Sequence, residues 1–206
     1  MNRFLLLIFF ALCSVLQMQG QNVSQDAILK EIGLAASQMK TLKCDFIQTK
    51  HMKMLGNKLV ANGKMYCSQP NKLCWEYAPP YSYSFILNQD KVMLKKGVKA
   101  EVFDIKRHKM FKEIAAIMMN SVLGNCFSDK SFKVSIKSSG NQYIATLIPL
   151  KKEMKMMFDR VILFYSNVQA MVNTVELYEK NGDRTIIELK NARKNEKIHE
   201  SVYKVE

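Results

Sequence analysis

The stretch that decides the fold is Lys64-Met-Tyr-Cys-Ser-Gln-Pro-Asn-Lys-Leu-Cys-Trp-Glu-Tyr-Ala-Pro-Pro-Tyr81, which is typical of two strands joined by a tight turn. It contains the only tryptophan of the chain and three of its four prolines. If Pro70-Asn71 forms the turn, Tyr66 pairs with Trp75, and Tyr77 lies on the same face of the strand pair. The stretch therefore predicts an aromatic wall, formed by Tyr66, Trp75 and Tyr77, which either packs into an ordinary core or binds a hydrophobic ligand.

The same register places Cys67 opposite Cys74, so these two cysteines are the pair expected to form a disulfide if the chain contains one. Direct cross-strand disulfides are geometrically demanding, and small buried free cysteines are common. Two interpretations therefore stay open, a Cys67–Cys74 bridge or free thiols. The spacing does not indicate a zinc site, because no second closely spaced Cys/His pair exists.

Hydrophobic periodicity outside this stretch predicts two helices and about ten strands. Ser24 or Asp26 can cap a first helix, and a second helix is expected at about Lys109–Val122, stopped by Gly124-Asn125. After Lys40 the period changes to two, and further strands are expected at Lys58–Cys67, Leu73–Tyr77, Ser82–Leu87, Lys91–Leu94, Val98–Phe103, Phe132–Ser138, Tyr143–Pro149, Arg160–Tyr165, Met171–Glu179 and Arg184–Lys190.

These elements predict a mainly β fold with helices, of the α+β class. So many strands favour one large antiparallel sheet that curls into an incomplete barrel, because curling limits exposed edges. We expect the helices to cover the concave side. No linker or repeat divides the chain, so residues 21–206 are expected to form a single domain.

The first twenty residues have the pattern of a cleaved secretory signal peptide. Arg3 gives a basic start, and an unbroken apolar run follows from Phe4 to Leu12. This run is too short to span a membrane. The sequence therefore predicts a soluble, exported protein.

Charge is unevenly distributed along a chain whose formal net charge is +13. Eight Lys or Arg residues lie between Lys91 and Lys112, with only Glu101 and Asp104 to balance them. Such a surface favours anionic partners such as lipid headgroups or an acidic protein, and nucleic acid is the least expected of these in an exported protein. A solvated surface without a specific partner explains the pattern equally well.

Motifs that would indicate an enzyme or a metal centre are absent from the sequence. The three histidines are widely spaced, and there is no G-x-S-x-G, no Gly-rich phosphate loop and no HExxH. We therefore expect a protein that is not an enzyme and that needs no metal or cofactor. Methionine clusters, such as the one at Met52 and Met54, suit plastic apolar surfaces, although ordinary core filling explains them more simply.

The order of features resembles one family. Phe46-Ile-Gln48-Thr-Lys50, a strand with Gly63, and Gln69-Pro70-x-x-Leu73-x-Trp75-x-Tyr77-x-x-Pro80 are similar to motifs of the LolA family of periplasmic outer-membrane lipoprotein carriers. The resemblance implies an incomplete barrel closed by helices over a hydrophobic cavity. It also implies a periplasmic chaperone that takes lipoproteins, by their acyl chains, from an inner-membrane lipoprotein-releasing ABC transporter to an outer-membrane acceptor.

The resemblance assigns roles to individual residues. It implies that Phe46, Leu73 and Trp75 line the cavity, and the register argument adds Tyr66 and Tyr77. Phe85 and Leu87 on the next strand are weaker additions, Ile114 and Met118 are expected on a lid helix, and Gln69 stands where the family commonly has a lid-holding arginine. Because glutamine carries no charge, the expected latch is weaker.

Three alternatives to a monomeric lipoprotein carrier remain at this point. One is a sensor of lipid or envelope stress with a related fold, and another is an enzyme that uses Cys44 or Cys126. The third is a basic module that binds a membrane surface through residues 91–112. The salt dependence of binding distinguishes the basic module from a protein that buries acyl chains. Binding by surface charge weakens at high salt, whereas burial of acyl chains does not.

Overall fold

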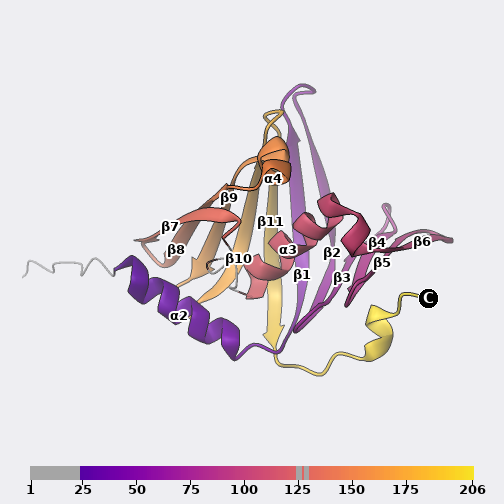
Figure 1. Cartoon of the computed structure of the whole chain (residues 1–206), viewed down its shortest axis with the longest axis horizontal. Helices are drawn as coiled ribbons and strands as arrows, with labels where there is room; N and C mark the ends of the chain where they lie inside the picture. The colour runs from indigo at the N-terminus through magenta and orange to yellow at the C-terminus, as the bar shows by residue number, and fades with distance from the viewer. Residues whose placement is uncertain (1–23, 124–126, 128–129) are drawn as a thin grey trace, which may run out of the picture.

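The computed structural model describes residues 24–123, 127 and 130–206, and Figure 1 shows their arrangement. The expected signal peptide, the helix stop at Gly124-Asn125 and Cys126 lie outside the described residues. One antiparallel sheet of eleven strands has the order β6-β5-β4-β3-β2-β1-β11-β10-β9-β8-β7. The strands are β1 (Thr41–Met52), β2 (Asn57–Ser68), β3 (Lys72–Tyr77), β4 (Tyr83–Asn88), β5 (Lys91–Lys96), β6 (Lys99–Asp104), β7 (Phe132–Ser139), β8 (Gln142–Pro149), β9 (Phe158–Ser166), β10 (Met171–Glu179) and β11 (Arg184–Lys194).

The sheet is strongly curved and does not close, since β6 and β7 remain at its two edges. Three helices lie on its concave face in Figure 1, namely α2 (Gln25–Ser37), α3 (Lys109–Leu123) and α4 (Lys152–Met157). One core cluster joins buried residues of all three helices to the sheet, among them Ile28, Ala115 and Met154. The predicted incomplete barrel with helices over its concave side is therefore confirmed.

Helix α2 begins as the sequence predicted. The Ser24 side-chain oxygen accepts a hydrogen bond from the amide of Ala27 at 3.2 Å, which satisfies one of the free donors at the helix start. Ile28, Ile32 and Ala36 lie on one stripe and are buried against the sheet. The opposite side of the helix faces solvent.

The register of the β2–β3 hairpin differs by one residue from the prediction. Met65 pairs with Trp75 and Tyr66 pairs with Cys74, because the connection takes three residues, 69–71, instead of two. A shift of one residue moves every side chain of one strand to the other face of the sheet. Tyr66 therefore lies on the convex face, and its predicted place beside Trp75 is wrong.

The C-terminal segment covers part of the convex face. It includes a short 3-10 helix, η3 (Glu200–Tyr203), and the Tyr203 side chain is completely buried. The Tyr203 hydroxyl is hydrogen-bonded to Ser68 Oγ at 2.8 Å, and Asn88 Nδ2 donates to its carbonyl oxygen at 3.0 Å. A second, smaller core cluster forms here with Cys74 and Ile86. Neither this segment nor α4 was predicted from the sequence.

Gly63 allows the aromatic wall to form. A Cβ atom at this position would clash with the Glu76 carbonyl oxygen and lie 2.7 Å from a Phe46 ring carbon. Phe46 and Gly63 are direct partners in the β1–β2 pair, so the ring lies across the glycine. The glycine is therefore needed for close approach of an aromatic ring and a neighbouring backbone.

Replacing Gly63 by alanine should destabilise the protein, because the Glu76 backbone and the Phe46 ring must both shift. We expect a loss of about 1–3 kcal/mol in the free energy of unfolding, measured by urea denaturation. Gly33→Ala is the matched control: Gly33 lies inside α2 with nothing within 4 Å of the added Cβ. That substitution should stabilise the protein by about 0.4–1 kcal/mol. Equal effects of the two substitutions would contradict this role of Gly63.

Candidate functional site

The concave face gathers most of the residues predicted to bind a ligand. Five of them are buried in one cluster, with exposed fractions of 1% for Phe46, 1% for Leu73, 4% for Trp75, 8% for Phe85 and 5% for Leu87. They come from β1, β3 and β4, which lie in the same half of the sheet. The structure therefore brings these residues together in space, whereas Tyr66 lies on the other face.

The centre of this apolar patch is a pair of stacked rings. The Phe46 and Trp75 ring centroids are 4.2 Å apart with an interplanar angle of 28°. Tyr77 meets Phe46 edge-on at 5.2 Å, and its hydroxyl donates to Gln48 Oε1 at 2.9 Å. The buried Trp75 Nε1–H has no acceptor in hydrogen-bonding geometry among the described residues. The Trp75 N–H nevertheless interacts with the Tyr77 hydroxyl: burial raises the pKa of that hydroxyl, and contacts with Trp75 and Gln48 oppose the rise. The patch thus combines a wide apolar surface with a small polar group of Trp75, Tyr77 and Gln48.

The predicted cavity residues are covered in this conformation, since Phe46, Leu73 and Trp75 are at most 4% exposed. A void under α2, lined by Ile32, Met39, Val122 and other residues, has a volume of only about 10 Å³. This is about the space that one water molecule needs. An apolar concave surface gains contacts when the helices pack onto it, so the empty protein closes on itself. A ligand can reach the Phe46–Trp75 patch only if an element that covers it moves.

Helix α3 covers the patch, and of the two residues that the sequence placed on the lid, Met118 packs against the core cluster. The buried residues of α3 include Ala115, Ile117 and Met119, whereas Ile114 and Met118 are only half-buried at the margin of the contact. The helical period alone fits both sets, since Ala115 and Met119 are spaced like Ile114 and Met118. A groove of about 230 Å³ runs beside α3 and is lined by Leu87, Asp90, Ile105, Ala115, Met119 and others. This side of the helix is therefore incompletely packed.

Gln69 holds a helix, but the helix is α2 and not the predicted lid α3. Its Nε2 donates to the carbonyl oxygens of Ala36 at 3.3 Å and Met39 at 2.8 Å. Asn195, which the sequence analysis missed, fixes the same end of the helix: its Nδ2 donates to the Gln38 carbonyl oxygen at 3.0 Å. Two neutral amides therefore satisfy carbonyl groups that are left free where α2 ends.

Of the two interpretations left open for Cys67 and Cys74, the structure shows free thiols and no bridge between them. Cys67 pairs with Leu73, and Tyr66 pairs with Cys74, so the two cysteines point to opposite faces of the sheet. Cys44, Cys67 and Cys74 are free and buried. Burial raises the pKa of the Cys67 thiol to about 12, and burial together with the charge of Glu76 does the same for Cys74. Both thiols are therefore neutral at neutral pH and unsuited to nucleophilic chemistry.

The described part of the chain contains no group of three or more His, Cys, Asp or Glu side chains that could hold a metal ion. In the same residues no helix is both long enough and apolar enough to cross a membrane. The lysines at 91, 95, 96 and 99 are exposed on β5 and β6, and Lys106 forms an ion pair with Asp90 at 2.6 Å.

Comparison with known proteins agrees with this architecture. An outer-membrane lipoprotein carrier protein from Nitrosospira multiformis is 24% identical over 166 residues, which make up 80% of this chain and 77% of that relative. An uncharacterized conserved protein from Thermus thermophilus superposes with a TM-score of 0.52 at 7% identity, covering 88% of this chain and 93% of the other. The MucA/MucB complex of Pseudomonas aeruginosa gives a TM-score of 0.52 at 7% identity, covering 89% of this chain and 62% of the other.

The structural likenesses at such low identity show the fold alone. The family comes from the sequence, because the family model described as "Outer membrane lipoprotein carrier protein LolA" matches residues 37–206, which is most of the chain. The protein therefore belongs to the LolA family of outer membrane lipoprotein carrier proteins.

Proposed function

We propose that this protein is a periplasmic carrier that binds the acyl chains of lipoproteins on its concave face and moves them from the inner towards the outer membrane. The observation that carries the proposal is the buried patch around Phe46 and Trp75, which helices cover without filling every gap. The exported form, residues 21–206, would act as a single-domain monomer. It would receive lipoproteins from an inner-membrane ABC transporter and pass them to an outer-membrane acceptor.

The energetics of acyl transfer suit such a patch. Burying one CH₂ group is worth about 0.8 kcal/mol, and a bilayer offers an acyl chain nearly the same gain. A carrier must therefore match the bilayer closely, so that it holds the lipid and still releases it. The lining is broad and mainly apolar, and it consists of aromatic rings, Leu87 and the flexible Met119. It does not depend on many buried polar groups that would bind the lipid tightly.

Opening requires α2 or α3 to leave the sheet, so it breaks polar contacts of both helices. Glu31 of α2 accepts a hydrogen bond from the Tyr143 hydroxyl at 2.9 Å, and Glu113 of α3 lies 3.2 Å from Lys151 Nζ. Gln69 and Asn195 hold the end of α2, and the Tyr165 hydroxyl donates to the Ser121 carbonyl oxygen of α3 at 3.2 Å. Neutral hydrogen bonds of this kind contribute about 0.5–1.5 kcal/mol each. The apolar contact therefore supplies most of the closing free energy, and an entering acyl chain can replace that contact.

The second candidate function, a module that binds membrane surfaces through residues 91–112, has the exposed lysines on β5 and β6 in its favour. A lipid or envelope-stress sensor with the same fold could use the same apolar patch. The family match favours the carrier over both. We expect no catalytic activity.

Placing a charge in the patch should abolish cargo binding. Trp75→Asp puts a carboxylate where an acyl chain would lie, so the amount of lipoprotein that co-purifies with residues 21–206 should fall about tenfold or more. Ile47→Asp is the matched control, because Ile47 neighbours Phe46 on β1 but points to the convex face and is 38% exposed. Normal cargo binding by a cooperatively folded Trp75→Asp variant would refute the site.

Loosening α2 should ease opening. Gln69→Ala removes two hydrogen bonds to α2, so we expect about 1–2 kcal/mol lower stability and faster hydrogen exchange of the α2 amides. Gln69→Arg should restore or exceed wild-type protection, because a charged donor bonds carbonyl oxygens more strongly. Unchanged exchange in α2 for both variants would show that Gln69 is not a latch.

A further inference from the structure

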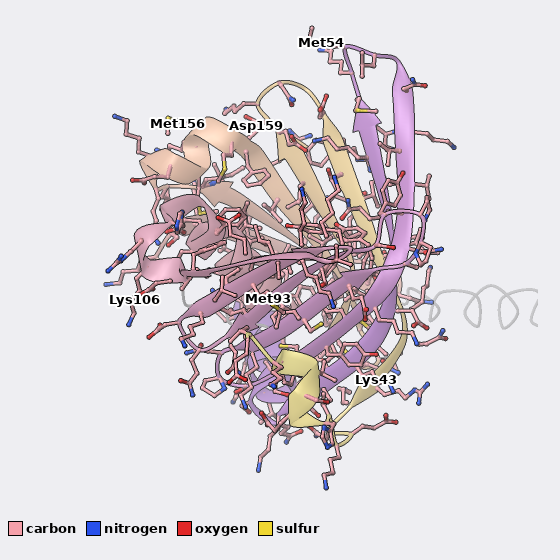
Figure 2. The ribbon with its side chains drawn as sticks, turned by 90° about the vertical axis from the view of Figure 1, so that its right-hand side faces the viewer. Lys43, Met54, Met93, Lys106, Met156 and Asp159 are labelled. Carbon is pink, nitrogen blue, oxygen red and sulfur yellow. The ribbon has the colours of Figure 1, made fainter. Side chains whose placement is uncertain are left out.

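The tip of the β1–β2 hairpin exposes apolar side chains that the proposed acyl site does not use. We define the hairpin tip as residues 52–58, at the far end of the long strands β1 and β2. Met54 is 91% exposed and Leu55 is 69% exposed. Figure 2 shows Met54 at the extreme end of the molecule, beyond the helices and the other strands. Two adjacent exposed apolar residues at a projecting apex are typical of an interaction site.

Positive charge surrounds this apolar apex. Lys53 and Lys58 are exposed within the hairpin tip, Lys50 and His51 precede it, and residues 50–60 contain no Asp or Glu. The structure shows no ion pair between the side chain of Lys53 or Lys58 and any described residue. The apex therefore combines insertable apolar groups with free cations, which matches an anionic surface.

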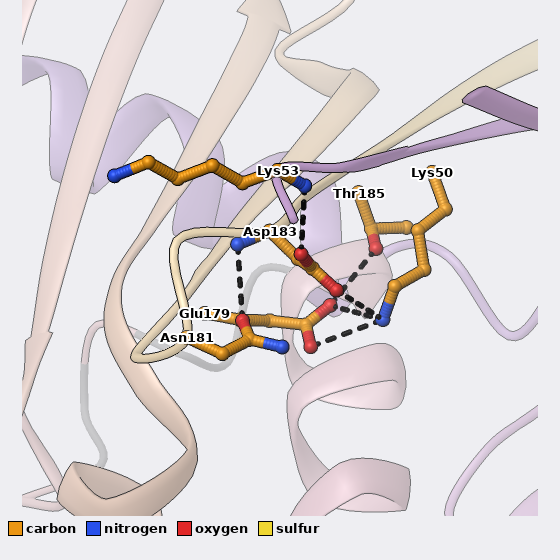
Figure 3. A network of polar contacts seen from close by, with 6 residues as sticks. All are labelled: Lys50, Lys53, Glu179, Asn181, Asp183 and Thr185. Atoms are coloured by element: carbon orange, nitrogen blue, oxygen red, sulfur yellow. Dashed lines mark hydrogen bonds and ion pairs between the residues drawn. The ribbon is translucent and has the colours of Figure 1, made fainter. Parts of the chain in front are cut away.

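The base of the hairpin is braced, so that the apex is held away from the sheet. Lys50 Nζ lies 2.9 Å from Glu179 Oε1 and 3.5 Å from Asp183 Oδ2, and the Lys53 amide donates to Asp183 Oδ1 at 3.0 Å. Figure 3 shows these contacts between β1 and the β10–β11 turn. The nearby acids Glu179 and Asp183 are thus engaged at the base of the hairpin. They do not form ion pairs with the side chains of Lys53 and Lys58 at the tip.

The apex also continues the concave face. Leu59 and Ala61 are the partners of Lys50 and Gln48 in the β1–β2 pair, and Gly63 is the partner of Phe46. Because alternate residues of a strand share a face, Leu59 and Ala61 extend a strip of small and apolar side chains from the Phe46–Trp75 patch towards the hairpin tip.

We propose that the hairpin tip inserts into the interface of an anionic lipid bilayer, with Met54 and Leu55 among the upper acyl chains and Lys53 and Lys58 at the phosphates. A hollow beside the tip is lined by Met52, Lys53, Asn57, Lys58 and neighbouring residues, but not by Met54 or Leu55. A bilayer fits this apex, because its two most exposed apolar side chains project outside that hollow, whereas the anchor residues of a protein interface pack into pockets. The insertion brings the end of the concave face that Leu59 extends close to the membrane. It goes beyond the proposed function, since it requires no cargo.

The test is binding of cargo-free residues 21–206 to sedimented vesicles, comparing phosphatidylglycerol–phosphatidylcholine mixtures with pure phosphatidylcholine. We expect binding to the anionic vesicles only. The double substitution Met54→Glu and Leu55→Glu should weaken it about tenfold or more, because it removes the apolar insertion and adds repulsion. Lys53→Glu with Lys58→Glu should also weaken binding and make it less sensitive to salt.

Two controls keep the outcome specific. Val168→Glu changes another exposed apolar side chain, 88% exposed in the β9–β10 turn, and should leave vesicle binding unchanged. Lys95→Glu with Lys96→Glu removes charge at the end of β5 and should reduce binding only slightly. All these positions are exposed, so each variant should keep the wild-type unfolding transition.

The proposal is overturned if the Met54/Leu55 variant binds anionic vesicles like the wild type, if the β5 variant loses binding instead, or if wild-type protein binds no vesicles. The last outcome, together with binding of the tip to an isolated acceptor protein, would assign the tip to a protein partner. Cargo capture by the Met54/Leu55 variant is measured separately and should be normal. Loss of cargo capture by this variant would count against the proposed acyl site and not against membrane insertion of the hairpin tip.

Discussion

The close approach of Phe46 to Gly63 and Trp75 is the contact on which the rest of the structure depends. Gly63 has no side chain, so the Phe46 ring can lie across β2 and stack on Trp75 of the next strand. This stack forms the floor of the concave face, and Leu73, Phe85 and Leu87 extend it. The helices then have an apolar surface to cover, and covering it is what closes the molecule.

Closure of this kind has to be reversible in a carrier. At the C-terminal end of α2 the contacts are neutral amide hydrogen bonds from Gln69 and Asn195, and a groove remains beside α3. Glu31 of α2 also accepts from Tyr143, and Glu113 of α3 pairs with the half-exposed Lys151. A half-exposed ion pair contributes only about 0–1 kcal/mol. The closed state is thus stabilised mainly by apolar burial, which is the interaction that an acyl chain reproduces.

Much of the fold followed from the sequence, because hydrophobic periodicity and capping are local. The Ser24 cap, the alternating strands and the grouping of Phe46 with Trp75 were all predicted correctly. The hairpin register was predicted incorrectly, because the sequence around Pro70 fits a connection of two residues as well as one of three. The three-residue connection moves Tyr66 and one cysteine to the other face of the sheet. The partner of Gln69 and the burial of Tyr203 depend on contacts between distant segments, which no local pattern contains.

A single residue can report directly on acyl binding at the concave face. Trp75 is the only tryptophan and lies in the middle of the patch, so its fluorescence is specific for the proposed acyl site. The most direct measurement is quenching of this emission by lipids that carry bromine on their acyl chains, with the same lipids brominated only in the headgroup as control. We expect saturable quenching by the acyl-brominated lipid alone. Emission that stays unchanged while the lipid is bound would place the lipid elsewhere and contradict an acyl site at Trp75.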